Sequence, residues 1–142
     1  MPLPALKTSL LAAALLLPLA LPGAAPAHEA EPAAGAAPQQ SILRRQALPD
    51  GMELIATRLH VPPGGTAPGH HHAGTLFVYM LSGQVRSGLD GGEPVLYGPG
   101  ESWMEPEGTH HSFFENASQT EPAELLVVFV APENATLTTM DK

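Results

Sequence analysis

Histidines gather in two short stretches of this sequence, and imidazole is the side chain that most often binds transition metals in proteins. A turn rich in Gly and Pro precedes His70, His71 and His72. A second turn further along the chain precedes His110 and His111. Successive side chains of a strand point to opposite faces, so His70 and His72 share one face and His71 lies on the other. With His111 they form a candidate site for zinc, copper, iron or nickel, all of which suit neutral imidazole.

Other polar side chains near these turns stay open as alternatives. Strand alternation turns His71 and His110 away from the candidate site, although His110 takes the place of His111 if the turn is shifted by one residue. Glu101 and Glu105 precede the second turn and are candidates for a general base or a fourth ligand. Because most glutamates are solvated surface groups, the spacing leaves these alternatives undecided.

Length and composition restrict the class of protein. The chain has 142 residues, which fits one domain, and it contains seven histidines but no cysteine. Imidazole rather than thiolate is therefore expected at a metal site, and no disulfide is available to stabilise the fold.

The N-terminal segment has the pattern of a cleavable export signal. Lys7 precedes an apolar run at residues 10–21, and the small residues at 25–27 fit a cleavage point. The sequence therefore predicts a signal peptide over residues 1–27, cleavage after Ala27, and a mature protein in the periplasm or secreted from the cell. The apolar run is shorter than the roughly 20 residues of a membrane span. An uncleaved anchor is thus the alternative, and no membrane insertion is expected after cleavage.

The mature chain is strongly acidic. Cleavage removes Lys7 and leaves five basic and fourteen acidic residues, a net charge of −9. Arg44 and Arg45 are adjacent, but the sequence has no larger basic cluster. Proteins that bind nucleic acid or anionic lipid electrostatically need such a cluster. The sequence therefore predicts neither partner and favours a small-molecule ligand.

The folded domain is predicted at residues 46–135. Residues 28–45 begin with an Ala- and Pro-rich stretch without periodicity, which is typical of a flexible N-terminal leader. Ile42 begins a segment of this leader that is either a linker or a short strand against a sheet edge or a partner subunit. Residues 136–142 are expected to form a C-terminal tail.

Short alternating segments separated by Gly and Pro predict an all-β fold. Strands are expected at residues 52–61, 76–81, 84–89, 95–97, 111–116 and 125–130. In the first of these, the more apolar face is expected to be buried and carries Ile55, Thr57, Leu59 and Val61. A sandwich or barrel follows, most simply a jelly roll. Because the domain is small, a homodimer formed through the segment around Ile42 and an outer sheet face is a candidate assembly.

The first histidine stretch resembles a motif of a known family. The spacing of Gly64, His70, His72 and the strand-closing Gly83 is similar to the first motif of the cupin superfamily. That family usually carries a Glu metal ligand at the position held here by Leu76. The resemblance therefore implies a ligand set without this carboxylate.

The second stretch resembles the second cupin motif. Gly100, Pro106, Gly108 and His111 have its spacing, and Asn116 comes one residue later than the family's Asn. Together the two motifs cover roughly residues 54–130. The resemblance implies a small single-domain protein of the cupin type 2 conserved-barrel kind, whose fold is a double-stranded β-helix or jelly-roll barrel.

The resemblance also implies a function for the histidines. Three ligands, His70, His72 and His111, would hold one divalent ion, which is iron, manganese, nickel, copper or zinc. Neutral ligands leave the ion its full positive charge, which favours anionic ligands and lowers the pKa of a bound water. The expected pocket walls are Val78, Met80, Trp103, Phe113 and Phe129.

Two functions follow from such a site, and the sequence assigns no catalytic residue to either. The first is a dioxygenase-like oxidoreductase, similar to quercetin-type dioxygenases, that acts on a small aromatic molecule. The second is a non-catalytic protein that binds a small molecule or a metal ion. Cupins host both kinds of function, and a fold alone does not decide between them.

Overall fold

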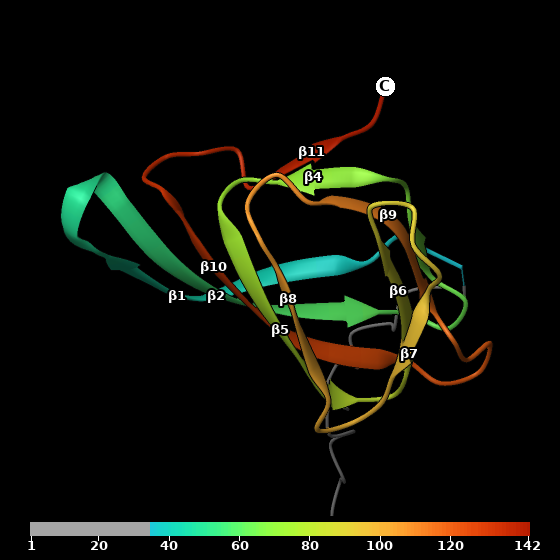
Figure 1. Ribbon diagram of the computed structural model, residues 1–142. Helices are drawn as coiled ribbons and strands as arrows, with labels where there is room; N and C mark the ends of the chain where they lie inside the picture. Colours follow the sequence, from blue (N-terminus) through green and yellow to red (C-terminus); the bar gives the residue numbers. More distant parts are fainter. Residues whose placement is uncertain (1–34) are drawn as a thin grey trace, which may run out of the picture.

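The computed structural model describes residues 35–142, and most of this part of the chain is β-strand (Figure 1). The predicted signal peptide at residues 1–27 lies outside the described residues. Between residues 35 and 142, no helix is long and apolar enough to span a membrane.

The strands form two antiparallel sheets. The first has the strand order β1-β2-β10-β5-β8, and the second has the order β11-β4-β9-β6-β7, with β3 also paired to β9. In chain order the elements are β1 Gln39–Ala47, the 3-10 helix η1 Pro49–Gly51, β2 Met52–Val61, β3 Thr66–Ala67, β4 His70–His72, β5 Thr75–Ser82, β6 Val85–Leu89, β7 Val95–Tyr97, β8 Ser102–Glu105, β9 His110–Asn116, β10 Ala123–Pro132 and β11 Thr138–Met140. This arrangement confirms the predicted all-β jelly roll.

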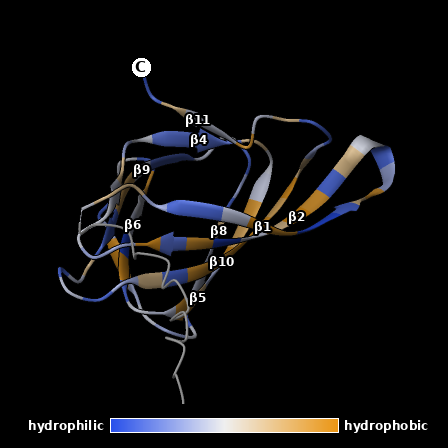
Figure 2. Cartoon of the chain, turned by 180° about the vertical axis from the view of Figure 1, so that it is seen from behind, coloured by the Kyte–Doolittle hydropathy of each residue, from blue (hydrophilic) through white to orange (hydrophobic). Residues whose placement is uncertain are grey.

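Alternation along the strands builds the core between the sheets. In β2, Ile55, Thr57 and Val61 are buried as predicted, and Leu59 is half-buried. The neighbouring strands β5 and β10 bury Leu76, Val78, Met80, Leu125, Val127 and Phe129. Because every second residue faces inward, the other face of these strands remains outside the core. Figure 2 shows the resulting mixture of hydrophobic and hydrophilic residues along single strands.

The segment predicted as a flexible leader ends in a strand. Residues 39–45 belong to β1, which pairs antiparallel with the edge of β2. The alternative of a short strand against a sheet edge is therefore confirmed for the segment at Ile42. All side chains of β1 are exposed, so backbone hydrogen bonds hold it rather than an apolar face, and hydropathy alone could not reveal it. The end of the β1–β2 hairpin projects from the barrel (Figure 1).

The predicted C-terminal tail also contains a strand. β11 pairs antiparallel with β4, with Thr138 opposite His72 and Met140 opposite His70. The last strand therefore lies directly beside the first histidine stretch, near the C-terminus marked in Figure 1. Backbone pairing of so short a segment depends on the strand already present, which explains why its own sequence did not predict it.

Candidate metal centre

Neighbouring strands β4 and β9 bring the predicted histidines together. His70 is the register partner of His111, and His72 follows His70 on the same face of β4. The ring centroid of His70 lies 4.6 Å from that of His72 and 4.8 Å from that of His111. One nitrogen of each ring lies within 4.8 Å of the others, so this inner cluster of three histidines could hold one metal ion.

Hydrogen bonds to carbonyl groups orient two of the rings. His70 Nδ1 donates to the Pro68 carbonyl at 2.7 Å. His72 Nδ1 donates to the Leu137 carbonyl at 3.2 Å and also lies 3.1 Å from Thr138 Oγ1. A carbonyl only accepts, so Nδ1 of each ring carries the proton and Nε2 is a lone pair. The two Nε2 atoms face each other at 3.1 Å. A cation between them would relieve the repulsion, and histidines held in this way are typical of metal sites.

His111 offers a buried nitrogen that is left unpaired. Its Nε2 lies 2.9 Å from Ser87 Oγ, whereas its Nδ1 has no hydrogen-bond partner within residues 35–142. Burial, reinforced by the charge of His70, lowers the pKa of His111 to about 3 and that of His72 to about 4. Both rings are therefore neutral near pH 7, which is the form that binds a metal. A buried nitrogen without a partner, in a ring that lies next to that of His70, fits a divalent transition metal.

A buried carboxylate lies beside the inner cluster. Glu105 in β8 is 2% exposed, and its Oε1 and Oε2 lie 3.5 Å from His111 Nδ1 and 3.8 Å from His72 Nε2. Burial raises the pKa of Glu105, and a hydrogen bond from Trp103 opposes this shift. Glu101, the other carboxylate considered from the sequence, is exposed and accepts a hydrogen bond from the Gly98 backbone instead. The sequence carries a signal for this burial, because Glu105 lies two residues after Trp103 in the same strand and therefore shares its inward face.

The inner cluster faces a cavity of about 260 Å³ between the sheets. Val78 and Phe129 line it as predicted, and the ring of Phe129 meets that of His72 edge-on at 5.5 Å. Further apolar walls come from Leu59, Leu76, Phe114, Leu125, Val127 and Met140. The site is therefore a polar donor set at one side of a largely apolar chamber.

Three residues predicted to line this cavity do not do so. Met80 is fully buried in the core, and Trp103 points its indole N–H at Glu105. Phe113 is 38% exposed because the pairing of β6 with β9 shifts register at a bulge between Gly88 and Leu89. A bulge changes which side chains face inward, so Phe114 takes the predicted place of Phe113.

An outer cluster is formed by His71 and His110, on the opposite face of the same two strands, together with Asp141, which follows β11. The rings of His71 and His110 stack at 4.7 Å, and His110 Nε2 lies 2.8 Å from Asp141 Oδ2. His110 does not replace His111 in the inner cluster, because strand alternation directs it outward as the spacing predicted.

The protein is a β-barrel of two antiparallel sheets, and its inner face carries three histidines that could hold a metal ion. A family model described as a cupin domain matches residues 57–129, which is more than half of the chain. The chain therefore belongs to the cupin family. No curated protein matches this sequence significantly.

Several solved structures share this fold. A conserved protein with a double-stranded β-helix domain from Klebsiella pneumoniae is similar with a TM-score of 0.56 and 21% identity, over 79% of this chain and 90% of that one. The DMSP lyase DddQ from Ruegeria pomeroyi has a TM-score of 0.53 and 23% identity, over 61% of this chain and 42% of the lyase. An oxalate oxidase in complex with the substrate analogue glycolate has a TM-score of 0.53 and 21% identity, over 66% of this chain and 57% of the oxidase.

These similarities establish the fold and nothing narrower. The chain spans less than two thirds of the lyase and of the oxidase, and all identities are below 25%. Neither reaction is thereby transferred to this protein, because one fold carries many functions.

Proposed function

We propose that this protein is an exported, metal-dependent oxidoreductase of the dioxygenase type that acts on a small aromatic molecule. The observation that carries the proposal is the opening of the inner cluster onto an apolar cavity of about 260 Å³. An engineered apolar cavity of about 150 Å³ already binds benzene, so a single substituted aromatic ring is the appropriate size of ligand. The metal is iron, manganese, nickel, copper or zinc.

A bound divalent ion with open coordination positions would supply Lewis-acid or redox chemistry to this chamber. The chain's own residues supply the rest. Carbonyl groups hold His70 and His72 in the metal-binding tautomer, and the ring of Phe129 packs against His72. The apolar walls exclude water from the ligand. These features support turnover rather than a closed structural ion.

The competing function is a non-catalytic protein that captures a small molecule or a metal ion. It uses the same cavity and the same histidines, and it differs only in that the ligand leaves unchanged. Oxygen consumption is therefore the measurement that separates the two functions.

The test uses the untagged mature protein, reconstituted separately with each of the five candidate ions. We expect about one ion per chain in the inner cluster. With iron or another redox-active ion, we expect oxygen consumption in the presence of members of a panel of phenols and catechols. The matched control is His70→Ala/His72→Ala, which should retain neither ion nor activity. Binding of an ion and a phenol without oxygen uptake would refute the oxidoreductase and support the non-catalytic binding function. A wild type that binds none of the ions would refute the metal centre.

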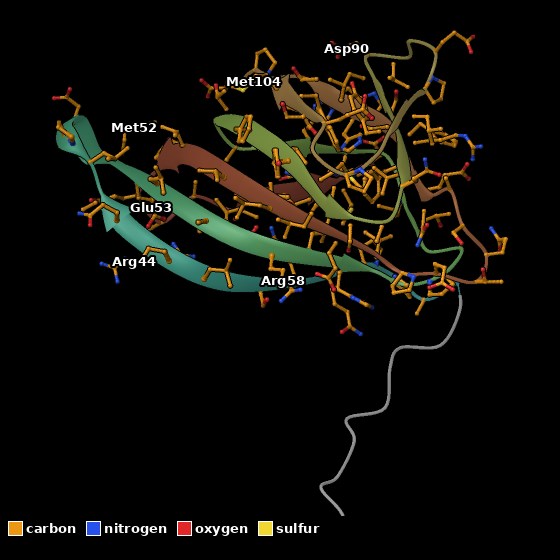
Figure 3. The ribbon with its side chains drawn as sticks, turned by 90° about the horizontal axis from the view of Figure 1, so that it is seen from below. Arg44, Met52, Glu53, Arg58, Asp90 and Met104 are labelled. Carbon is orange, nitrogen blue, oxygen red and sulfur yellow. The ribbon has the colours of Figure 1, made fainter. Side chains whose placement is uncertain are left out.

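We further propose that the protein acts as a homodimer in the periplasm or outside the cell. Large apolar side chains on the outer face of the first sheet support an interface there, namely Phe77, Tyr79, Leu81, Met104 and Val130. Phe77 is the register partner of Met104, so these side chains adjoin, and Figure 3 shows Met104 at the surface. Light scattering after size exclusion should give twice the chain mass for the wild type and the chain mass for Met104→Glu.

A further inference from the structure

The carboxylate that the first motif lacks has a counterpart one strand away. Leu76 faces the cavity from β5, where cupins usually carry a Glu ligand. Its Cα partner across the antiparallel pairing of β5 with β8 is Glu105. Residues directly opposite each other in a sheet point to the same face. The side chain of Glu105 therefore enters the same cavity beside Leu76.

The contacts of this carboxylate converge on the inner cluster. Glu105 Oε2 and His111 Nδ1 are both buried, and neither has a hydrogen-bond partner within residues 35–142. Oε2 lies 3.8 Å from His72 Nε2, and Oε1 lies 3.5 Å from His111 Nδ1. Buried polar atoms are almost always paired in native proteins, and buried charges are paired or coordinate metals. One cation between Glu105 Oε2 and His111 Nδ1 would give each of these two atoms a partner.

Two aromatic residues fix the carboxylate in this orientation. Trp103 Nε1 donates a hydrogen bond of 2.9 Å to Glu105 Oε1. The indole is itself stacked on Tyr97, with ring centroids 4.3 Å apart and an interplanar angle of 28°. Oε1 is held by the indole and lies beside His111, so Oε2, which faces His72, is the oxygen of this carboxylate that has no hydrogen-bond partner within residues 35–142. Groups that orient ligands in this way are typical of metal sites.

We propose that Glu105 is the fourth protein ligand of the metal centre and binds through Oε2, replacing the missing ligand at Leu76 from the adjacent strand. This inference rests on the proposed metal centre. Its consequence is that the ion and its protein ligands carry a net charge of +1 rather than the full +2 expected for three histidines alone. The preference for anionic substrates should fall accordingly, and an oxygen donor favours manganese and iron relative to an all-nitrogen set.

The test measures binding of cobalt(II) by competition with a chromophoric chelator, together with the visible spectrum of the cobalt protein. Glu105→Gln removes the charge and should weaken binding by at least about tenfold, since even residues behind the ligands have effects of that size. It should also change the cobalt spectrum, because a charged carboxylate donor is replaced by a neutral amide. The matched control is Glu53→Gln, which removes another largely buried glutamate, in the projecting hairpin (Figure 3), and should leave both readouts unchanged.

A second variant protects the test against a folding defect. Leu76→Glu/Glu105→Leu moves the carboxylate to the opposite strand of the same pair, where it faces the same cavity, and should recover most of the lost affinity. Cobalt affinity and spectrum that stay at wild-type values in Glu105→Gln would overturn the ligand role of Glu105 while leaving the three-histidine centre intact. A wild type that binds no cobalt would overturn the metal centre itself, and this inference with it.

Discussion

The inner and outer clusters are built from adjacent residues of the same two strands, yet they differ in nearly every property that matters for metal binding. His70 and His71 are neighbours in β4, and His111 and His110 are neighbours in β9. The inner cluster faces a largely apolar cavity and contains a buried nitrogen that has no hydrogen-bond partner in the described part of the chain. The outer cluster faces solvent, with the side chains of His110 and Asp141 35% and 44% exposed.

The difference shows that burial, more than residue type, decides what a histidine can do here. In the outer cluster His110 is already paired with Asp141, and both side chains are partly open to solvent. An ion bound there would have to disrupt this pair and compete with solvent. In the inner cluster an ion would satisfy atoms that have no other partner, and the neutral rings need not lose a proton.

Metal affinity should separate the clusters by the largest margin. His70→Ala/His72→Ala removes two of three inner nitrogens and should abolish binding of one zinc ion per chain. His71→Ala/His110→Ala should leave that binding unchanged, because it alters only the outer face. Isothermal titration of the untagged proteins with zinc checks both outcomes. Loss of tight binding in the outer variant alone would reverse the assignment.

Acid should destabilise the metal-free protein through the inner cluster. His72 and His111 have folded pKa values of about 4 and about 3, against 6.5 when unfolded, so the unfolded state binds more protons in between. Stability should therefore fall as pH drops from 6.5 toward 4, by up to about 1.4 kcal/mol per pH unit for each ring.

Burial raises the pKa of Glu105, which gives an opposite slope above its ordinary value of 4.5. Urea unfolding of the metal-free Glu105→Gln protein between pH 4 and 6.5 therefore isolates the contribution of the histidines. If the fall in stability with pH is unchanged in Glu105→Gln/His72→Gln/His111→Gln, the inner rings are not its source. The control Glu105→Gln/His71→Ala should keep the same pH dependence as Glu105→Gln.

The two faces of β9 also carry a matched pair of phenylalanines. Phe114 is buried beside the ring of His111 at 5.4 Å, whereas Phe113 is 38% exposed. Phe114→Ala should lower the free energy of unfolding by about 3 to 5 kcal/mol, as for other large-to-small core changes. Phe113→Ala should have a clearly smaller effect. Denaturant unfolding of the two variants measures both effects. Equal losses of unfolding free energy would contradict the conclusion that the bulge directs Phe114, and not Phe113, into the core.

The smallest effect is expected in the outer cluster. Asp141→Asn removes the exposed pair with His110 and should change the free energy of unfolding by less than about 1 kcal/mol. Thermal unfolding at low and high salt checks this value, because an exposed pair is screened. A larger loss, unaffected by salt, would indicate that this pair anchors β11 more strongly than an exposed contact can.

The inner ligands were predictable because they depend on geometry that is local to the chain. Side chains alternate along any strand with a period of two, so His70 and His72 share a face whatever surrounds them. The same rule placed His71 and His110 outside. The strand pattern predicted the jelly roll, and the motif spacing supported His111 as the third ligand. The structure confirms the barrel and brings these three histidines together.

Tertiary structure decided the features that depend on which strands become neighbours. Glu105 reaches the cluster because β8 pairs with β5 in a register that sets it opposite Leu76. Phe114 faces inward because a bulge against β6 shifts the alternation of β9. β1 and β11 exist as strands because the edges of β2 and β4 are there to pair with them. Backbone pairing between distant segments does not depend on local hydropathy and cannot be predicted from it. Strand alternation is a local property of the backbone, so a few consecutive residues are enough to predict it.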